Sequence, residues 1–176
     1  MADFRNIPGS QFSKGLRNNN PLNINAAGWK GETGIDGSEA IFTDTIFGFR
    51  AAAIELLRYQ NTYGLNTIND IVARWAPVAD GNDPVTYAAS VATAMGVDPG
   101  DQITLDAQTL NNLMVAMLPQ EIGQQATAMI DVNDIPAAIA MINLPVLSVV
   151  QGANGYGGIL LLSGIFLVLF ALSEKK

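Results

Sequence analysis

The stretch IFGFRAAAIELLRYQNTY, residues 46–63, has the apolar spacing of a long amphipathic helix. Phe49, Ala53 and Leu56 recur at intervals of three and four residues, so a helix would place them on one face. Gly64 follows directly, and glycine is the usual residue where a helix ends. We therefore predict a helix over these residues, with its apolar face turned toward a core.

Three further helices are predicted downstream, each after a residue that can cap a helix. Thr67, Asp83 and Asp106 each precede a run with helical spacing. Their side chains can accept hydrogen bonds from the free N–H groups of a first turn. Pro77 is expected to end the first of these helices, and Gly96 the second.

Residues 34–43 are the only part of the chain that favours β structure, as at most a short hairpin that ends in residues 40–42. The sequence therefore predicts a mainly α-helical fold, in which one small domain carries four capped helices.

The end of the chain is strongly apolar, and it contains no charged residue from Ile135 to Ser173. About 20 apolar residues suffice to cross a bilayer core of about 30 Å. Tyr156 and the two final lysines suit the two membrane interfaces. The sequence predicts one C-terminal transmembrane helix over residues 155–173.

Composition narrows the chemistry that the chain could perform. The net charge of −7 argues against a nucleic-acid partner, which would need a basic surface. The absence of cysteine and histidine excludes thiol and histidine catalysis and removes the usual zinc ligands. We expect no metal and no cofactor. Carboxylates remain, and these alone can cleave glycosidic bonds.

The motif GLRNNNPLNI, residues 15–24, is the most distinctive polar segment. We expect its three consecutive asparagines to lie outside the core. Asparagine amides suit the amides and hydroxyls of a sugar. Alternatively, the segment is a turn in which these side chains bond their own backbone. The residues alone leave both interpretations open.

This motif resembles the opening signature of phage virion proteins that are assigned as peptidoglycan-degrading, lysozyme-like domains. The resemblance continues in order along the chain, at residues 29–31, 41–42, 48–51, 66–68, 74–77, 82–87, 96–97 and 121–123. Two residues depart from the family pattern. Leu22 stands where the family usually has glycine, and Pro119 interrupts the helix before Glu121, so we expect a kink there.

The resemblance implies a lysozyme-like domain that cleaves glycan strands, with Glu121 as the catalytic acid. The substrate-binding residues that it implies are Arg17, Asn18, Asn19, Asn23, Trp29 and Arg50. The apolar neighbours Met117, Leu118 and Ile122 would raise the pKa of Glu121 into a useful range.

A hydrolase needs a second carboxylate, whereas a lytic transglycosylase uses the sugar's own hydroxyl. The acidic residues that could act as the second carboxylate are Glu32, Asp36, Glu39 and Asp44. Glu55, one turn before Arg58, is interpreted as a surface charge. Trp75 is interpreted as a packing residue on its helix.

Four segments are expected along the chain: an N-terminal arm (1–14), the lysozyme-like domain (15–125), an uncharged Ala/Pro linker (126–154) and the transmembrane helix (155–173). We expect a virion protein, anchored in a viral internal membrane or the host envelope, that opens the cell wall while the phage genome enters. Peptidoglycan, a lipid membrane and other virion proteins are the expected partners. The alternatives are a non-catalytic minor membrane protein of the virion, or a protein that perturbs or perforates membranes.

Overall fold

A computed structural model describes residues 3–6, 12–142 and 144. It contains seven α-helices, one 3-10 helix and a two-stranded antiparallel sheet over those residues. In chain order the elements are α1 (Lys14–Arg17), β1 (Glu32–Asp36), β2 (Glu39–Phe42), α2 (Thr45–Tyr63), α3 (Ile68–Trp75), η1 (Val78–Asp80), α4 (Pro84–Met95), α5 (Ala107–Ile122), α6 (Gln124–Thr127) and α7 (Asp134–Ala140).

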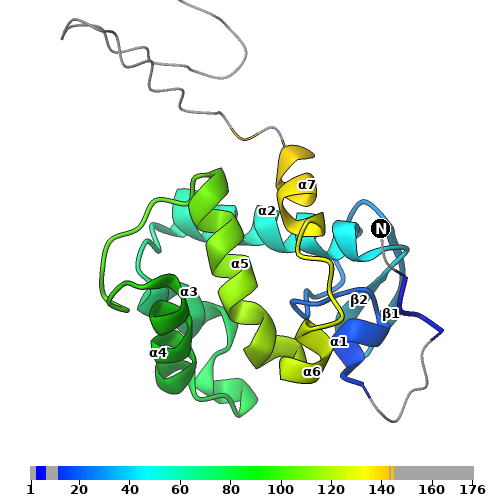
Figure 1. Ribbon diagram of the computed structural model, residues 1–176, viewed down its shortest axis with the longest axis horizontal. Helices are drawn as coiled ribbons and strands as arrows, with labels where there is room; N and C mark the ends of the chain where they lie inside the picture. The colour runs from blue at the N-terminus through cyan, green and yellow to red at the C-terminus, as the bar shows by residue number, and fades with distance from the viewer. Residues whose placement is uncertain (1–2, 7–11, 143, 145–176) are drawn as a thin grey trace, which may run out of the picture.

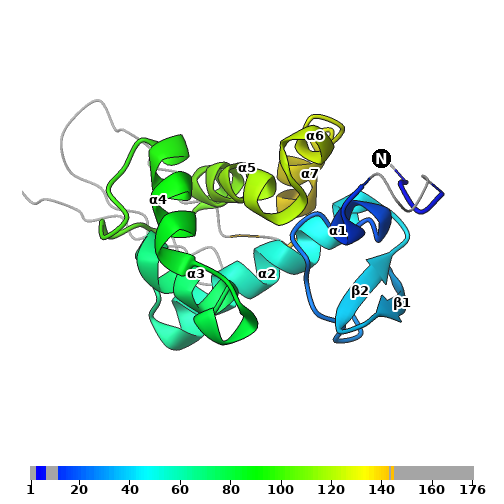
Figure 2. The same ribbon diagram turned by 90° about the horizontal axis from the view of Figure 1, so that it is seen from below.

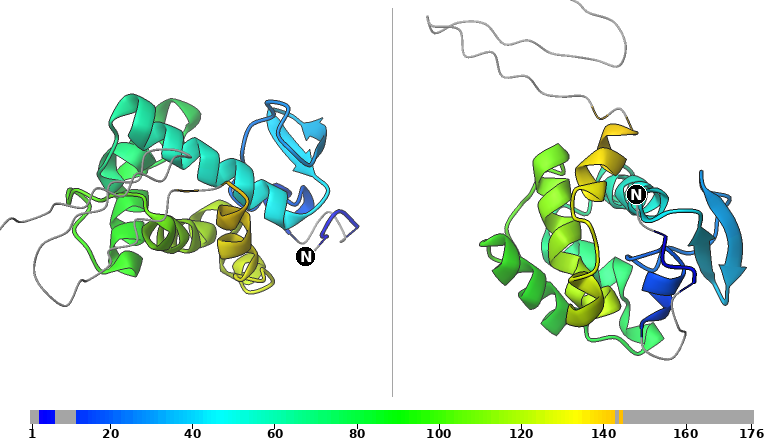
Figure 3. Two further views of the ribbon diagram at one scale, coloured as in Figure 1. Left: turned by 90° about the horizontal axis from the view of Figure 1, so that it is seen from above. Right: turned by 45° about the vertical axis from the view of Figure 1, so that its right-hand side comes forward.

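Helix α2 runs through the middle of the domain, from the hairpin at one end to α3 and α4 at the other (Figures 1 and 2). In both views of Figure 3 the hairpin and α4 lie at opposite ends of the molecule. Helix α5 crosses α2 at a steep angle (Figure 1), and the two contact each other. The core lies between them, where Phe49, Leu56 and Leu113 are fully buried.

Helices α3, α4 and α5 begin after the capping residues that the sequence indicates. Thr67, Asp83 and Asp106 each accept a hydrogen bond from the backbone N–H three residues later. Gly64 and Gly96 adopt left-handed backbone conformations after α2 and α4, and they end both helices. These features depend on neighbouring residues only, so the sequence is enough to place them.

The predicted fold class is wrong where it includes a membrane-spanning helix. Within the described part of the chain, no helix combines the length and the apolar character that a bilayer crossing needs. The longest, α2, has 19 residues and carries charged side chains. The predicted transmembrane helix, residues 155–173, lies outside the described residues. The same holds for most of the uncharged apolar tail on which the membrane-perforating alternative depends.

The helical domain extends beyond the predicted boundary at residue 125. Helices α6 and α7 fall in or next to the predicted linker, but α7 packs against α2 and α5 (Figure 1). Ile135 and Ala138 are fully buried there, and the Thr45 hydroxyl donates to the buried Asp134 carboxylate over 2.8 Å. The first part of the predicted linker is therefore part of the core.

We expect Ile135→Ala to lower the free energy of unfolding by about 2–4 kcal/mol, because it leaves a cavity under α7. Val132→Ala is the matched control, since Val132 is 47% exposed and its truncation should cost less than about 0.5 kcal/mol. Chemical denaturation measures both values. Equal losses in the two variants would show that α7 does not stabilise the domain.

The three consecutive asparagines of the 15–24 motif, Asn18, Asn19 and Asn20, are buried, so the expectation that they lie outside the core is wrong. Asn20 donates to the carbonyl oxygens of Ile24 (2.8 Å) and Ala40 (2.9 Å), and accepts from the Ile24 N–H (2.9 Å). Asn19 donates to the Phe42 carbonyl over 3.1 Å. The amide groups of Asn19 and Asn20 are therefore paired with the backbone of the loop and of β2, which allows these polar residues to be buried.

Candidate functional site

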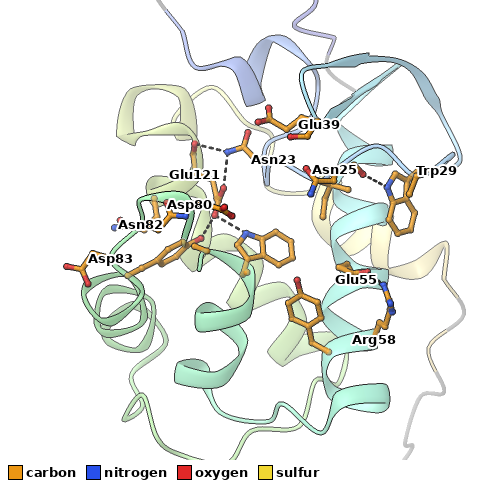
Figure 4. A pocket seen from close by; sticks show the side chains of 18 of the residues that line it. Asn23, Asn25, Trp29, Glu39, Glu55, Arg58, Asp80, Asn82, Asp83 and Glu121 are labelled. Atoms are coloured by element: carbon orange, nitrogen blue, oxygen red, sulfur yellow. Dashed lines mark hydrogen bonds and ion pairs between the residues drawn. The ribbon is translucent and has the colours of Figure 1, made fainter. Parts of the chain in front are cut away.

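An open cleft of about 1000 Å³ lies between the hairpin side of the domain and the side formed by α3, η1 and α4 (Figure 4). Asn23 and Glu39 line the hairpin side, and Trp75 and Tyr87 line the opposite side. Glu121, near the C-terminal end of α5, also lines it. The cleft therefore brings together residues that lie far apart along the chain.

The carboxylate of Glu121 accepts three side-chain hydrogen bonds inside this cleft. The Tyr87 hydroxyl (2.5 Å) and the Trp75 indole N–H (2.9 Å) both donate to Oε1. The Asn23 amide donates to Oε2 over 2.9 Å. These donors hold the carboxylate in one orientation toward the cleft (Figure 4).

The pKa of Glu121 is raised above its ordinary value. Burial is the main cause, because it penalises the ionised form. The hydrogen bonds from Tyr87, Asn23 and Trp75 favour the ionised form and partly oppose the shift, while the nearby charge of Glu39 adds to it. Burial also raises the pKa of the Tyr87 hydroxyl, which therefore remains a proton donor to Glu121.

Pro119 does not prevent this arrangement, although the sequence suggested that it would kink the helix. Helix α5 continues through Pro119 to Ile122. Proline lacks the N–H that would bond the carbonyl of Val115, four residues earlier. Val115 is 36% exposed, so water can bond that carbonyl instead. Leu22, the other departure from the family pattern, is buried in the core.

Asn23 links the 15–24 motif directly to Glu121. Its amide bonds both the side chain of Glu121 and, over 3.2 Å, its backbone carbonyl. Asn23 adopts a left-handed backbone (φ 50°), which asparagine tolerates better than most residues. A side chain on Gly15 would place a Cβ only 2.3 Å from Oδ1 of Asn23. Gly15 therefore leaves the space in which Asn23 reaches Glu121.

Sequence reasoning missed two of the residues that bond Glu121. Trp75 was predicted only to pack, and Tyr87 was not singled out. Both do contact the core, but each also carries a polar atom at the end of an apolar ring. A buried tyrosine or tryptophan usually finds a hydrogen-bond partner. The residue types at positions 75 and 87 could therefore have indicated a buried polar partner.

Among the acidic residues considered as the second carboxylate, Glu39 and Glu32 lie in different places relative to the cleft. Glu39 lines the cleft, and one of its oxygens pairs with the Lys14 ammonium over 3.0 Å. Its other oxygen, Oε2, is buried without a hydrogen-bond partner among the described residues. Glu32, in contrast, does not line the cleft and accepts from the backbone N–H groups of Ala27 and Trp29.

Asp36 and Asp44 also lie outside the cleft lining; Asp36 bonds Asn18, and Asp44 caps α2. Glu55 was interpreted as a surface charge, but it lines the cleft and is partly buried. The predicted pairing of Glu55 with Arg58 is present, at 3.3 Å.

Trp29 and Asn23 are the predicted substrate-binding residues that line the cleft. The indole N–H of Trp29 donates to the Asn25 carbonyl over 2.8 Å, which orients the ring at the cleft edge (Figure 4). A fixed, partly exposed indole ring at this edge suits stacking against a sugar face.

The other four predicted substrate-binding residues do not line the cleft. Arg17 donates to the Phe12 carbonyl, and Asn18 to the carboxylate of Asp36. Asn19 is fully buried. The Nε of Arg50, on α2, is buried and has no hydrogen-bond partner within the described part of the chain. Their contacts stabilise the domain and do not reach Glu121.

No group of three or more histidine, cysteine, aspartate or glutamate side chains that could hold a metal ion occurs in the described ranges.

The fold and the site together define the class of protein. It is a small helical domain with a hydrogen-bonded, partly buried glutamate in an open cleft. The sequence matches no protein-family profile. It is 38% identical over 121 residues to Protein P5 of Pseudoalteromonas phage PM2, and the alignment covers 65% of this chain and 74% of the phage protein. The chain belongs to the family of this phage protein.

Proposed function

We propose that this chain is a phage protein that cleaves the glycan strands of peptidoglycan, with Glu121 as the general acid. The observation that carries the proposal is the Glu121 carboxyl, which has a raised pKa, is held by three donors and lines a cleft that is open to solvent. The resemblance of residues 15–123 to peptidoglycan-degrading phage proteins supports the same activity.

The first step follows from the geometry of Glu121. A protonated Glu121 donates its proton to the glycosidic oxygen as the bond to the sugar carbon breaks. The carboxylate that remains is stabilised by the hydrogen bonds from Tyr87, Trp75 and Asn23. Burial keeps the proton available before the reaction, and the donors stabilise the charge that forms during it.

The second step depends on what attacks the sugar carbon. In a hydrolase a water molecule attacks, and Glu39 is the carboxylate in the cleft whose Oε2 lacks a partner among the described residues. In a lytic transglycosylase the 6-hydroxyl of N-acetylmuramic acid attacks, and no second carboxylate takes part.

Digestion of purified peptidoglycan by the full chain, followed by mass spectrometry of the products, tests the proposal. Reducing-end muramic acid identifies a hydrolase, and Glu39→Gln should then slow release by about 10²-fold or more. Anhydro-muramic products identify a transglycosylase, and Glu39→Gln should then leave the rate nearly unchanged. No release from walls of several chemical types would reject the proposal.

The rate of cleavage should fall as pH rises, because only the protonated Glu121 can act as the acid. Its raised pKa should place this alkaline limb above the ordinary glutamate value of about 4.3. Tyr87→Phe removes a donor that favours the ionised form, so it should move the limb to higher pH. A profile of kcat/KM against pH measures the shift. Tyr63→Phe is the control, since the Tyr63 hydroxyl bonds Arg58; the same shift in both variants would contradict the argument.

A second candidate function is a non-catalytic structural component of the virion. The similarity to a phage protein over 65% of the chain favours it, because that similarity alone does not require catalysis. In that case the bonds to Glu121 only connect the 15–24 loop, α3, α4 and α5. The digestion experiment separates the two functions, since a purely structural protein releases no product.

A further inference from the structure

The cleft is lined by five carboxylates and by one cation. The carboxylates belong to Glu39, Glu55, Asp80, Asp83 and Glu121. The cation is Arg58, on α2, whose side chain is 53% exposed. An anionic substrate group would be repelled along most of the cleft, so Arg58 marks the place where such a group is favoured.

A second arginine lies close to Arg58 and shares an aromatic ring with it. The guanidinium carbon of Arg74 is 4.0 Å from the ring centre of Tyr63, and that of Arg58 is 5.3 Å from the same centre. Arg74 also lies 5.2 Å from the ring centre of Tyr59, which lines the cleft. Stacking on these rings restricts both guanidinium groups to one small region.

The positive charges of Arg58 and Arg74 are only partly balanced by ion pairs among the described residues. Arg58 contacts Glu55 at 3.3 Å through Nη1, and its Nη2 donates to the Tyr63 hydroxyl over 2.6 Å. None of the ion pairs among residues 3–6, 12–142 and 144 includes Arg74. Two positive charges therefore converge on Tyr63, and Glu55 is the carboxylate that forms an ion pair with one of them among the described residues, in a chain whose net charge is −7.

We propose that Arg58 and Arg74 form a subsite that binds the carboxylates of the peptide stems of peptidoglycan. The subsite rests on the proposed function, because it assumes that a glycan strand occupies the cleft. Peptide stems branch from the strand and carry free carboxylates, and arginine is the side chain best suited to bind a carboxylate through paired hydrogen bonds.

The test measures binding of the full chain carrying Glu121→Gln, which keeps the strands intact. The ligands are soluble glycan strands with native stems, with amidated stems, and with the stems removed. Isothermal titration should show that native stems bind about tenfold more tightly than the other two forms. Amidation matters because it removes the charge but keeps the peptide.

The double variant Arg58→Gln with Arg74→Gln should abolish this preference and leave binding of the stem-free strand unchanged. Lys30→Gln is the charge control, because Lys30 is exposed and does not line the cleft; it should retain the preference. Thermal melting checks that each variant is folded.

Equal binding of native and amidated stems by the parent would overturn the subsite. A double variant that weakens binding of all three ligands equally would also overturn it. If the unaltered chain cleaves no wall, the proposed function fails, while the binding measurement still reports on the subsite separately. Cleavage without any stem preference would leave the proposed function intact and reject the subsite.

Discussion

Glu121→Gln should reduce the rate of peptidoglycan cleavage by about 10²–10⁴-fold, the usual effect of removing a general acid. The glutamine side chain has nearly the same size and shape, but it has no proton to donate to the glycosidic oxygen. Its oxygen can still accept the hydrogen bonds of Tyr87 and Trp75. Its nitrogen would face the Asn23 amide, a mismatch that should cost about 1 kcal/mol of stability.

Clearing of a peptidoglycan suspension measures the rate, and thermal melting shows that the variant remains folded. Asp98→Asn is the matched control, because Asp98 is exposed in the loop between α4 and α5 and does not line the cleft. Glu55 is unsuitable as a surface control, since it lines the cleft. A Glu121→Gln variant that cleaves as fast as the parent would reject Glu121 as the acid.

The same substitution should change how stability depends on pH. Because the folded state raises the pKa of Glu121, it binds the proton more tightly than the unfolded chain does. The stability linked to this proton is present below the ordinary glutamate pKa and is lost as pH rises through the raised pKa. Glu121→Gln should remove this part of the pH dependence.

Asn20→Ala should have the largest effect on folding, and we expect it to lower the free energy of unfolding by about 2–6 kcal/mol. The variant leaves two backbone groups without the partner that Asn20 provides: the N–H of Ile24 and the carbonyl of Ala40. The carbonyl of Ile24 loses the Asn20 amide but keeps the Ala40 N–H over 2.9 Å. Each such group costs about 1–3 kcal/mol. A loss of this size is comparable with the total stability of many small domains.

Asn20→Asp separates hydrogen bonding from packing, because it keeps the shape but removes both donated bonds. It should also destabilise the domain strongly. Asn61→Ala is the control at an exposed position of α2, with an expected change of less than about 0.5 kcal/mol. Denaturant unfolding of the three variants provides the comparison. If Asn20→Asp were as stable as the parent, the donated bonds to Ile24 and Ala40 would not hold the loop.

Sequence patterns were most informative where the physical cause is local. Caps such as Thr67 and Asp106 act on N–H groups within three residues, and the spacing of Phe49, Ala53 and Leu56 reports one helix face. The apolar neighbours of Glu121 also follow from the chain alone, whereas its place at the end of a helix was implied by the family resemblance. These features require no knowledge of which segments meet.

The sequence could not show which polar groups meet inside the fold. Asn23, Trp75 and Tyr87 are 98, 46 and 34 residues away from Glu121 along the chain, yet all three bond its carboxylate. Helical periodicity identifies a buried face, but it does not identify the element that covers that face. For the same reason α7 could not be recognised as part of the core.

The asparagine motif shows this division most clearly. Its residue types indicate that the segment from Gly15 to Ile24 can make many hydrogen bonds. The sugar-binding interpretation and the turn interpretation both depended on this capacity. Only the tertiary structure decided the partners: Asn20 bonds the backbone of β2 at Ala40, whereas Asn23 reaches Glu121. The reason is that an amide bonds whichever donor or acceptor the packing brings within about 3 Å, and packing is a property of the whole domain.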